Sequence, residues 1–364
     1  MKAFLAGLMA GVLLLTATPT FAAEQSATQV AAVAAQPMST EQRIADLESE
    51  LKELKAMYTK DKSVQIKKEK DAADRIQFSG KAKLEQEWDS RGGKSLYSKK
   101  NRMRVDFTQS YKVDNTWRLS TTERVTNYFN NTNDNDSGTY CSVKMVGNLG
   151  NHQTLTIGRF NWEDISGYSI GDSWVNGVKY DFGKNWKTTA IIGRLQNTDW
   201  GKAYGSSTDA PLYRTLVTDG NVGAIKTAAS ATQVMLHGNT EYVYEGQVKF
   251  PIIHNVSGSV DLMKSTADEY FGTGSVGHTY RLQYKGMNKS KKGSFGIFTQ
   301  YSNLPKAIDV YTGSPSMMDK NIWRVGADYV FEKNMWMRLT FDNGHKIANH
   351  ESYQDVKGVL YFLF

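Results

Sequence analysis

From Ile76 to the C-terminus, apolar and polar residues alternate with a period of two, which is the pattern of β-strands with one apolar and one polar face. In the first run the apolar positions are Ile76, Phe78, Gly80, Ala82, Leu84 and Trp88. The polar positions between them are Gln77, Ser79, Lys81, Lys83, Glu85, Glu87 and Asp89. Similar runs recur at 102–113, 242–250, 280–284 and 323–331.

Many of these runs are longer than the strands of soluble β-proteins, which average about 5–6 residues. A tilted strand needs about ten residues to cross a bilayer. Short and long polar connections also alternate, and no proline after Pro37 falls in a predicted strand. The pattern therefore predicts an all-β fold for residues 76–364, a transmembrane antiparallel up-and-down β-barrel. We count about 14 strands, or alternatively 16 if residues 196–239 hold one more hairpin.

The N-terminal segment has the features of an export signal. Lys2 precedes an apolar run over residues 4–15, and Thr20-Phe21-Ala22 resembles a small-x-small cleavage site. We expect residues 1–22 to be a signal peptide and residues 23–38, which are rich in Ala, Gln, Ser and Thr, to be a flexible linker.

Residues 39–75 follow a helical period. Ser39 or Thr40 can cap the helix, and Ile44, Leu47, Leu51 and Leu54 form an a/d seam flanked by charges. Two heptads are too short for an isolated coiled coil. The seam therefore predicts either self-association within a larger oligomer, which we favour, or an amphipathic helix that lies on its own domain.

Charge is distributed unevenly. Residues 1–75 hold ten basic and ten acidic residues, so the net charge of +7 belongs to residues 76–364. An arginine facing lipid near the bilayer midplane would cost roughly 2–4 kcal/mol, so the cations of the strands should face the lumen. The predicted lumen cations are Lys81, Lys83, Arg102, Arg104, Arg118, Arg281, Arg324 and Arg338. Such a wall would give a weak preference for anions.

The last run is apolar on one face at Val356, Gly358, Leu360, Phe362 and Phe364, and Phe364 is the final residue. Together with the export signal, 155–160 and 177–183, it resembles bacterial porins of the Gram-negative outer membrane. The resemblance implies passive diffusion of small hydrophilic solutes and ions, contact with outer-membrane lipid, and recognition of Leu360, Phe362 and Phe364 by the barrel-assembly machinery. It also implies a homotrimer whose N-terminal coiled coil lies in the periplasm.

In such porins the third long loop folds into the channel and narrows it. The resemblance therefore implies that Glu163, Asp164 and Asp172 face Arg102, Arg104 and Arg118 across a constriction. The alternative function is a structural envelope protein that uses its N-terminal helix as a tether and transports little.

Signals of other chemistry are weak. Gly167-Tyr168-Ser169-Ile170-Gly171 matches G-x-S-x-G, but no α/β pattern surrounds it, as a nucleophile elbow requires. Cys141 is the single cysteine, and the six histidines are scattered. We therefore expect no enzymatic activity, no metal or other cofactor, and no nucleic-acid partner.

Overall fold

The computed structural model describes residues 39–364, except 92–96, 130–135, 169, 172, 196–209, 237, 268–271, 273, 309–310 and 313–318. The predicted signal peptide (residues 1–22) and linker (residues 23–38) lie outside the described residues. The chain divides into two compact units at Ile66, and the second unit holds the β-sheet.

Helix α2 (Thr40–Arg75) is 36 residues long and begins with a capping box. The Gln42 backbone N–H donates to Ser39 Oγ, and the Ser39 N–H donates to Gln42 Oε1, each over 3.2 Å. The four seam residues Ile44, Leu47, Leu51 and Leu54 are between 52% and 64% exposed. Among the described residues, no helix is long and apolar enough to cross a membrane.

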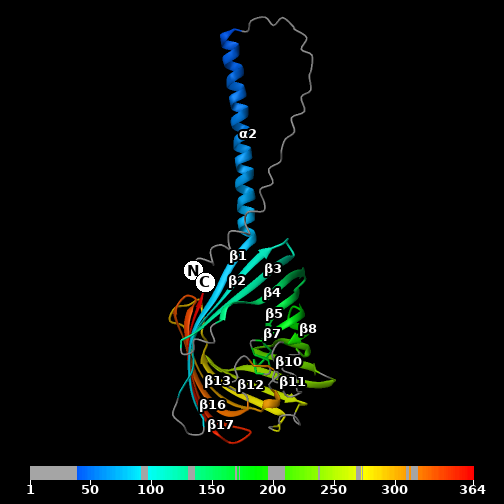
Figure 1. Ribbon diagram of the computed structural model, residues 1–364, viewed down its shortest axis with the longest axis vertical. Coiled ribbons are helices and arrows are strands. Elements are labelled where there is room, and N and C mark those ends of the chain that lie inside the picture. The colour runs from blue at the N-terminus through cyan, green and yellow to red at the C-terminus, as the bar shows by residue number, and fades with distance from the viewer. Residues whose placement is uncertain are drawn as a thin grey trace. The chain divides into compact units, whose positions relative to one another are not determined.

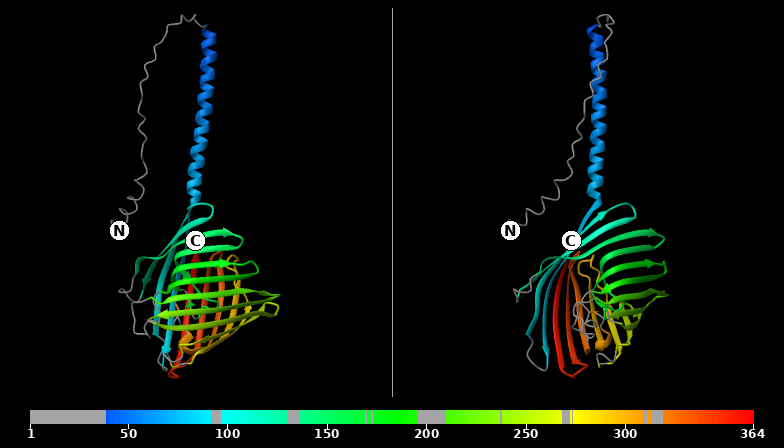
Figure 2. Two further views of the ribbon diagram at one scale, coloured as in Figure 1. Left: turned by 90° about the vertical axis from the view of Figure 1, so that its right-hand side faces the viewer. Right: turned by 45° about the vertical axis from the view of Figure 1, so that its right-hand side comes forward.

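Sixteen antiparallel strands form one closed barrel, in which β1 pairs with β18 (Figures 1 and 2). The strands are β1 (Ile76–Arg91), β2 (Tyr97–Lys112), β3 (Trp117–Tyr128), β4 (Asp136–Gly150), β5 (Gln153–Trp162), β7 (Ser173–Phe182), β8 (Trp186–Leu195), β9 (Leu212–Val222), β10 (Ile225–Leu236), β11 (Asn239–Ile253), β12 (Val256–Ser265), β13 (Val276–Lys285), β14 (Phe295–Leu304), β16 (Lys320–Glu332), β17 (Met335–Lys346) and β18 (Ser352–Leu363). The predicted all-β barrel is confirmed. Our first count of about 14 strands was too low, and the alternative of 16 holds because β9 and β10 form the additional hairpin.

The two faces of the sheet differ in polarity. Five large side chains at alternate positions of β16 and β17 are between 44% and 58% exposed: Trp323, Val325, Tyr329, Leu339 and Phe341. The side chains between them include Asp328 and Asp342, which are at most 6% exposed. An apolar outer band around a polar interior is the surface that a barrel in lipid requires.

The barrel closes at its C-terminal residue. The register of β1 and β18 runs from Lys81 opposite Leu363 to Arg91 opposite Tyr353. The Gly80 N–H donates to the Phe364 carbonyl over 2.7 Å, and the Phe364 N–H donates back to Gly80 over 3.1 Å. A Cβ on Gly80 would stand only 2.3 Å from the Phe364 ring, so the absence of a side chain makes room for that ring.

One proline contradicts the sequence prediction. Pro251 was expected in a connection, but it lies inside β11, where the pairing register shifts between Pro251 and Ile253. Pro251 is opposite Ser257, and the residue without a partner is the next one, Ile252. The bulge interrupts the regular ladder beside Pro251, where a residue with no N–H is tolerated.

We predict that the close approach of β7 and β8 depends on Gly177. A Cβ at Gly177 would stand 2.1 Å from the Ile192 carbonyl oxygen, which is backbone and cannot turn away. Gly177→Ala should lower the free energy of unfolding by about 1–3 kcal/mol in a urea titration of the detergent-solubilised protein. Gly246→Ala is the matched control, because no atom lies within 4 Å of the corresponding point. Equal stability of the two variants would contradict this account.

Candidate functional site

The interior wall carries arginine–carboxylate pairs between neighbouring strands. Arg102 contacts Glu85 through Nε and Nη2 at 2.7 Å. Arg324 contacts both carboxylate oxygens of Asp342 at 2.5 Å. Arg338 donates to both oxygens of Asp328 at 2.7 and 3.0 Å. Each of these three cations is therefore held by an acid of the same wall.

The remaining predicted cations of β1–β3 also have polar or aromatic contacts on this face. Lys83 lies 3.3 Å from Glu85, and Arg104 lies 3.0 Å from Asp106. Arg118 donates to Gln77 Oε1 over 2.6 Å, and the Lys81 ammonium stands 5.3 Å from the centre of the Tyr361 ring.

The role of the wall carboxylates could not be predicted from the sequence. Glu85 is 1% exposed, and its carboxylate forms ion pairs with Lys83, Arg102 and Lys357. The distance to the Lys357 ammonium is 2.6 Å. Alternation already placed Glu85 on the polar face. Its pairing with Arg102 depends on the register of β1 and β2, which a period of two does not reveal.

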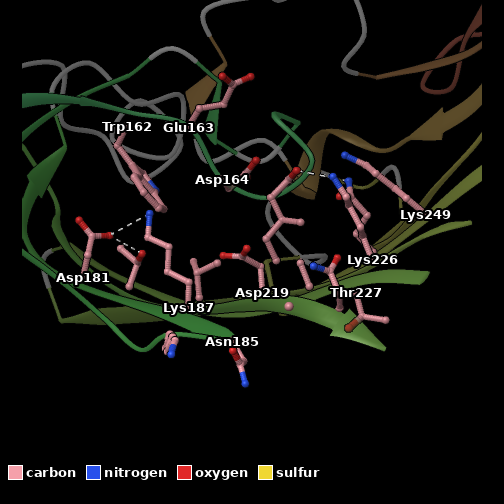
Figure 3. Close-up of a pocket in the computed structure, with 18 of the residues that line it drawn as sticks. Trp162, Glu163, Asp164, Asp181, Asn185, Lys187, Asp219, Lys226, Thr227 and Lys249 are labelled. Carbon is pink, nitrogen blue, oxygen red and sulfur yellow. Dashed lines mark hydrogen bonds and ion pairs between the residues drawn. The ribbon is translucent and has the colours of Figure 1, made fainter. Parts of the chain in front are cut away.

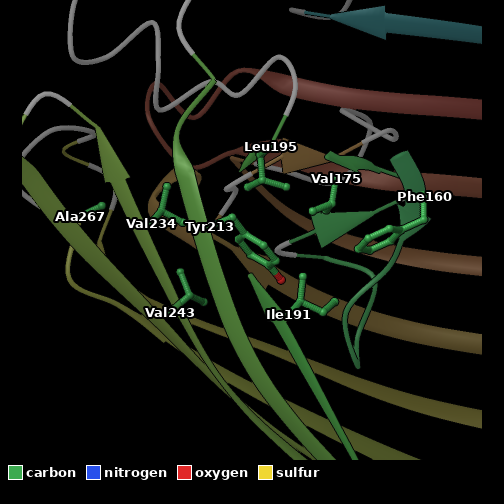
Figure 4. Close-up of a cluster of buried hydrophobic side chains, with 8 residues drawn as sticks. All are labelled: Phe160, Val175, Ile191, Leu195, Tyr213, Val234, Val243 and Ala267. Atoms are coloured by element: carbon green, nitrogen blue, oxygen red, sulfur yellow. The ribbon is translucent and has the colours of Figure 1, made fainter. Parts of the chain in front are cut away.

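Part of the interior wall is apolar, which the sequence analysis did not expect. Eight buried side chains from β5, β7–β11 and the end of β12 gather in one cluster (Figure 4): Phe160, Val175, Ile191, Leu195, Tyr213, Val234, Val243 and Ala267. Trp162 packs against this cluster, and its Nε1–H donates to the Tyr213 hydroxyl over 3.0 Å.

The β5–β7 connection (residues 163–172) contacts the interior wall on β11 and β14. The Ile165 carbonyl accepts from Gln247 over 3.3 Å, and the Ser166 hydroxyl donates to Glu245 over 3.3 Å. The Tyr168 hydroxyl accepts from Gln300 over 2.8 Å. Burial raises the pKa of the Tyr168 phenol above its ordinary value.

The β14–β16 connection (residues 305–319) also packs inside. Its short helix η1 (Lys306–Ile308) buries Ile308 completely, in a cluster with Met263, Leu304, Ile322 and Tyr353 against which Tyr168 packs. Gly277 leaves room for this helix, because a Cβ there would stand 3.2 Å from Ile308 Cγ1. Strand β15 (Tyr311–Thr312) of this connection pairs in parallel with β6 (Ile170–Gly171) of the β5–β7 connection. The two connections are therefore joined to each other.

The acids predicted in the third loop lie at the start of the β5–β7 connection. Asp164 Oδ1 accepts from the Gly167 N–H and from the Ser166 hydroxyl. Glu163 and Asp164 line a cavity of about 480 Å³, in company with Lys226 and Lys249 (Figure 3). Asp172 lies outside the described residues. Arg102, Arg104 and Arg118 contact Glu85, Asp106 and Gln77 of the wall, respectively.

Three further cations lie at matched positions of neighbouring strands. Lys226 of β10 is directly opposite Lys249 of β11. Across β12, where Ser259 is the register partner of both neighbours, Arg281 of β13 lies at the same level as Lys249. Lys249 and Arg281 line a second cavity of about 320 Å³ beneath Tyr168. The sequence analysis named Arg281 but neither lysine, because only the register brings the three together.

The structure offers no support for the weaker chemical signals. Ser169 of the G-x-S-x-G match lies outside the described residues, and the segment belongs to a connection between antiparallel strands. Cys141, the single cysteine, is buried. Among the described residues, no group of three or more His, Cys, Asp and Glu side chains is arranged to hold a metal ion.

A closed barrel of sixteen antiparallel strands, apolar outside and polar inside, has the fold of the outer-membrane porins. Solved structures of outer-membrane barrels have a similar fold. A triple variant of the Rhodopseudomonas blastica porin matches with a TM-score of 0.52 at 12% identity, over 79% of this chain and 100% of that one. An outer membrane protein of Vibrio cholerae, OmpT with loop L8 deleted, matches with a TM-score of 0.52 at 10% identity over the same shares. No family model and no curated protein matches the sequence.

We predict that Glu85 holds three cations of the wall in place. Glu85→Gln would leave Lys83, Arg102 and Lys357 close together without their shared carboxylate. The variant should lose about 1.5–3 kcal/mol of stability, measured by thermal melting and urea titration in detergent. Glu332→Gln is the control, because Glu332 pairs with Lys292 at an exposed turn, and its melting temperature should not change. A Glu85→Gln barrel as stable as this control would contradict the prediction.

Proposed function

We propose that this chain is an outer-membrane porin, through which small hydrophilic solutes and ions diffuse passively. The observation that carries the proposal is the division of the closed sheet into an apolar outer face and a charged inner face. Charged side chains such as Arg324 and Asp342 point inward at the level where Val325 and Phe341 point outward. Water inside the barrel is the solvent that such an inner face requires.

The proposed orientation places α2 in the periplasm. Residue Arg75 is followed directly by β1, whose first residue Ile76 pairs with Tyr111, next to the short β2–β3 turn. Short turns lie on the periplasmic side of bacterial barrels, and long loops lie outside.

We propose that the pore is narrowed by two connections rather than by the third loop alone. The β5–β7 connection contacts β11 and β14, and the β14–β16 connection buries Ile308 against β12, β14, β16 and β18 of the same part of the wall. Their pairing through β6 and β15 supports a common constriction.

The proposed selectivity is a weak preference for anions. The arginines at positions 102, 324 and 338 are compensated by wall carboxylates and contribute less than their number suggests. The net charge of +7 and the cations at 226, 249 and 281 support the preference. Salt would screen it over about 8–10 Å.

The proposed assembly is a homotrimer in contact with outer-membrane lipid. The exposed seam of α2 supports self-association, because Ile44, Leu47, Leu51 and Leu54 would be covered by copies of the same helix. Leu360, Phe362 and Phe364 at the end of the chain remain the proposed signal for the barrel-assembly machinery. The exposed ring of Phe364 supports a role in recognition.

A structural role with little transport is the second candidate. The long helix with its exposed seam could act as a tether, and the two inward connections and the apolar cluster reduce the open cross-section. Permeation measurements separate the two candidates.

The permeation test is swelling of liposomes that contain the purified full-length protein. Sugars of increasing size should enter at falling rates, because a narrowed aqueous pore sieves by size. Ile308→Asp places a carboxylate among buried apolar side chains and should release the β14–β16 connection, which raises the entry rate of a disaccharide several-fold. Lys306→Asp, in the same helical turn, is the control and should leave the rate near the wild-type value. Liposomes that do not swell with any sugar would favour the structural candidate.

The oligomer test uses the seam of α2. Leu47→Glu combined with Leu51→Glu puts like charges in the seam and should convert trimers to monomers in mass measurements of the detergent complex. Glu50→Gln, outside the seam, should leave the mass unchanged. A trimer that survives the double substitution would show that α2 does not hold the assembly.

A further inference from the structure

We propose that Lys226, Lys249 and Arg281 form a binding site for a multivalent oxyanion in the wall of the barrel. The proposal rests on the proposed pore function and adds to it a defined site and a ligand class. The ligand chemistry is a small anion with two or more charges on oxygen, such as inorganic phosphate or a tricarboxylate.

The register of the strands brings the three cations to one level of the wall. Lys226 and Lys249 are direct partners on neighbouring strands, and both lie on the inner face. Like charges directly opposite each other destabilise a sheet. Arg281 lies at the same level two strands further along, beyond Ser259. The wall therefore holds three cations in a row that the fold itself does not favour.

In the described part of the chain, no carboxylate forms an ion pair with Lys226, Lys249 or Arg281, whereas Arg102, Arg324 and Arg338 all have one. Five acids border the two cavities: Glu163, Asp164, Asp181 and Asp219 line the first, and Asp261 lines the second. Asp261 accepts a hydrogen bond from Gln247. An anion in the lumen would supply the missing charge.

The cavities of about 480 and 320 Å³ both border Lys249, Gln247 and Ile165, so they adjoin at the second cation. Figure 3 shows Lys226 and Lys249 to the right of Asp164 of the β5–β7 connection, which lines the same cavity. A solute that passes this connection therefore meets the cations while it is confined.

The guanidinium carbon of Arg281 stands 3.6 Å from the centre of the Phe298 ring, and Nη2 donates to Gln283 over 3.1 Å. Stacking and one hydrogen bond fix the plane of the guanidinium, while the other N–H groups stay available. A fixed guanidinium fork matches the oxygen geometry of phosphate and carboxylate, and the two lysines add point charges.

The test is block of the ion current through the full-length protein in a planar bilayer. In potassium chloride, inorganic phosphate and citrate are added in separate experiments, and nitrate serves as a monovalent anion. Phosphate, citrate or both should reduce the current at concentrations where nitrate does not. The anion that blocks at the lower concentration is the one that the site prefers. Lys226→Gln with Lys249→Gln should raise the half-blocking concentration at least about tenfold.

The control removes the same charge from another part of the inner wall. Lys112→Gln with Lys144→Gln, on β2 and β4, should leave the half-blocking concentration within about twofold of wild type. An equal loss of block in this control would assign the effect to net charge and overturn the site. Absence of block by both multivalent anions would also overturn it, while the unblocked current still reports whether the barrel conducts.

A folding measurement keeps the test decisive. Because Lys226 and Lys249 repel each other, the double glutamine variant should melt at the wild-type temperature or above. A clear fall in its melting temperature would show that the lysines stabilise the fold, which contradicts the starting point of the proposal.

Discussion

The structure depends on the closure of one hydrogen-bonded ladder. In an apolar medium every backbone N–H and C=O group must be paired within the protein, and an open sheet edge would leave a row of them unpaired. Sixteen strands meet this condition because β18 returns to β1, and the final pair joins Phe364 to Gly80. Strand alternation then sends apolar side chains to the outside and polar ones to the inside along the whole sheet.

Closure also concentrates charge on a wall with limited access to water. The barrel compensates most of it locally, through cross-strand pairs such as Arg324 with Asp342 and through Glu85, which serves three cations. Lys226, Lys249 and Arg281, which form no ion pair within the described part of the chain, border the cavities next to the β5–β7 connection. The distribution of pairs, rather than the total of +7, therefore decides where the charge of the wall is unbalanced.

Much of this fold could be predicted from the sequence, because alternation is a local property of neighbouring residues. It identified the barrel, its polar face and the apolar last strand. The count of strands was less certain, since β9 and β10 carry small residues such as Ala229 and Ala231 on their outer face. Register and long-range packing could not be predicted from the sequence, because they depend on residues far apart in the chain. They decide that Arg102 meets Glu85, that a bulge accommodates Pro251, and that Ile191 faces an apolar interior while Ile192 faces outward.

The central claim is that this barrel contains a water-filled passage. Single-channel recording of the purified full-length protein in a planar lipid bilayer tests it most directly. The account predicts discrete current steps of uniform size, with a zero-current potential in a salt gradient whose sign indicates a modest excess of anion flow. A correctly folded barrel that inserts into the bilayer and yields no steps would contradict it.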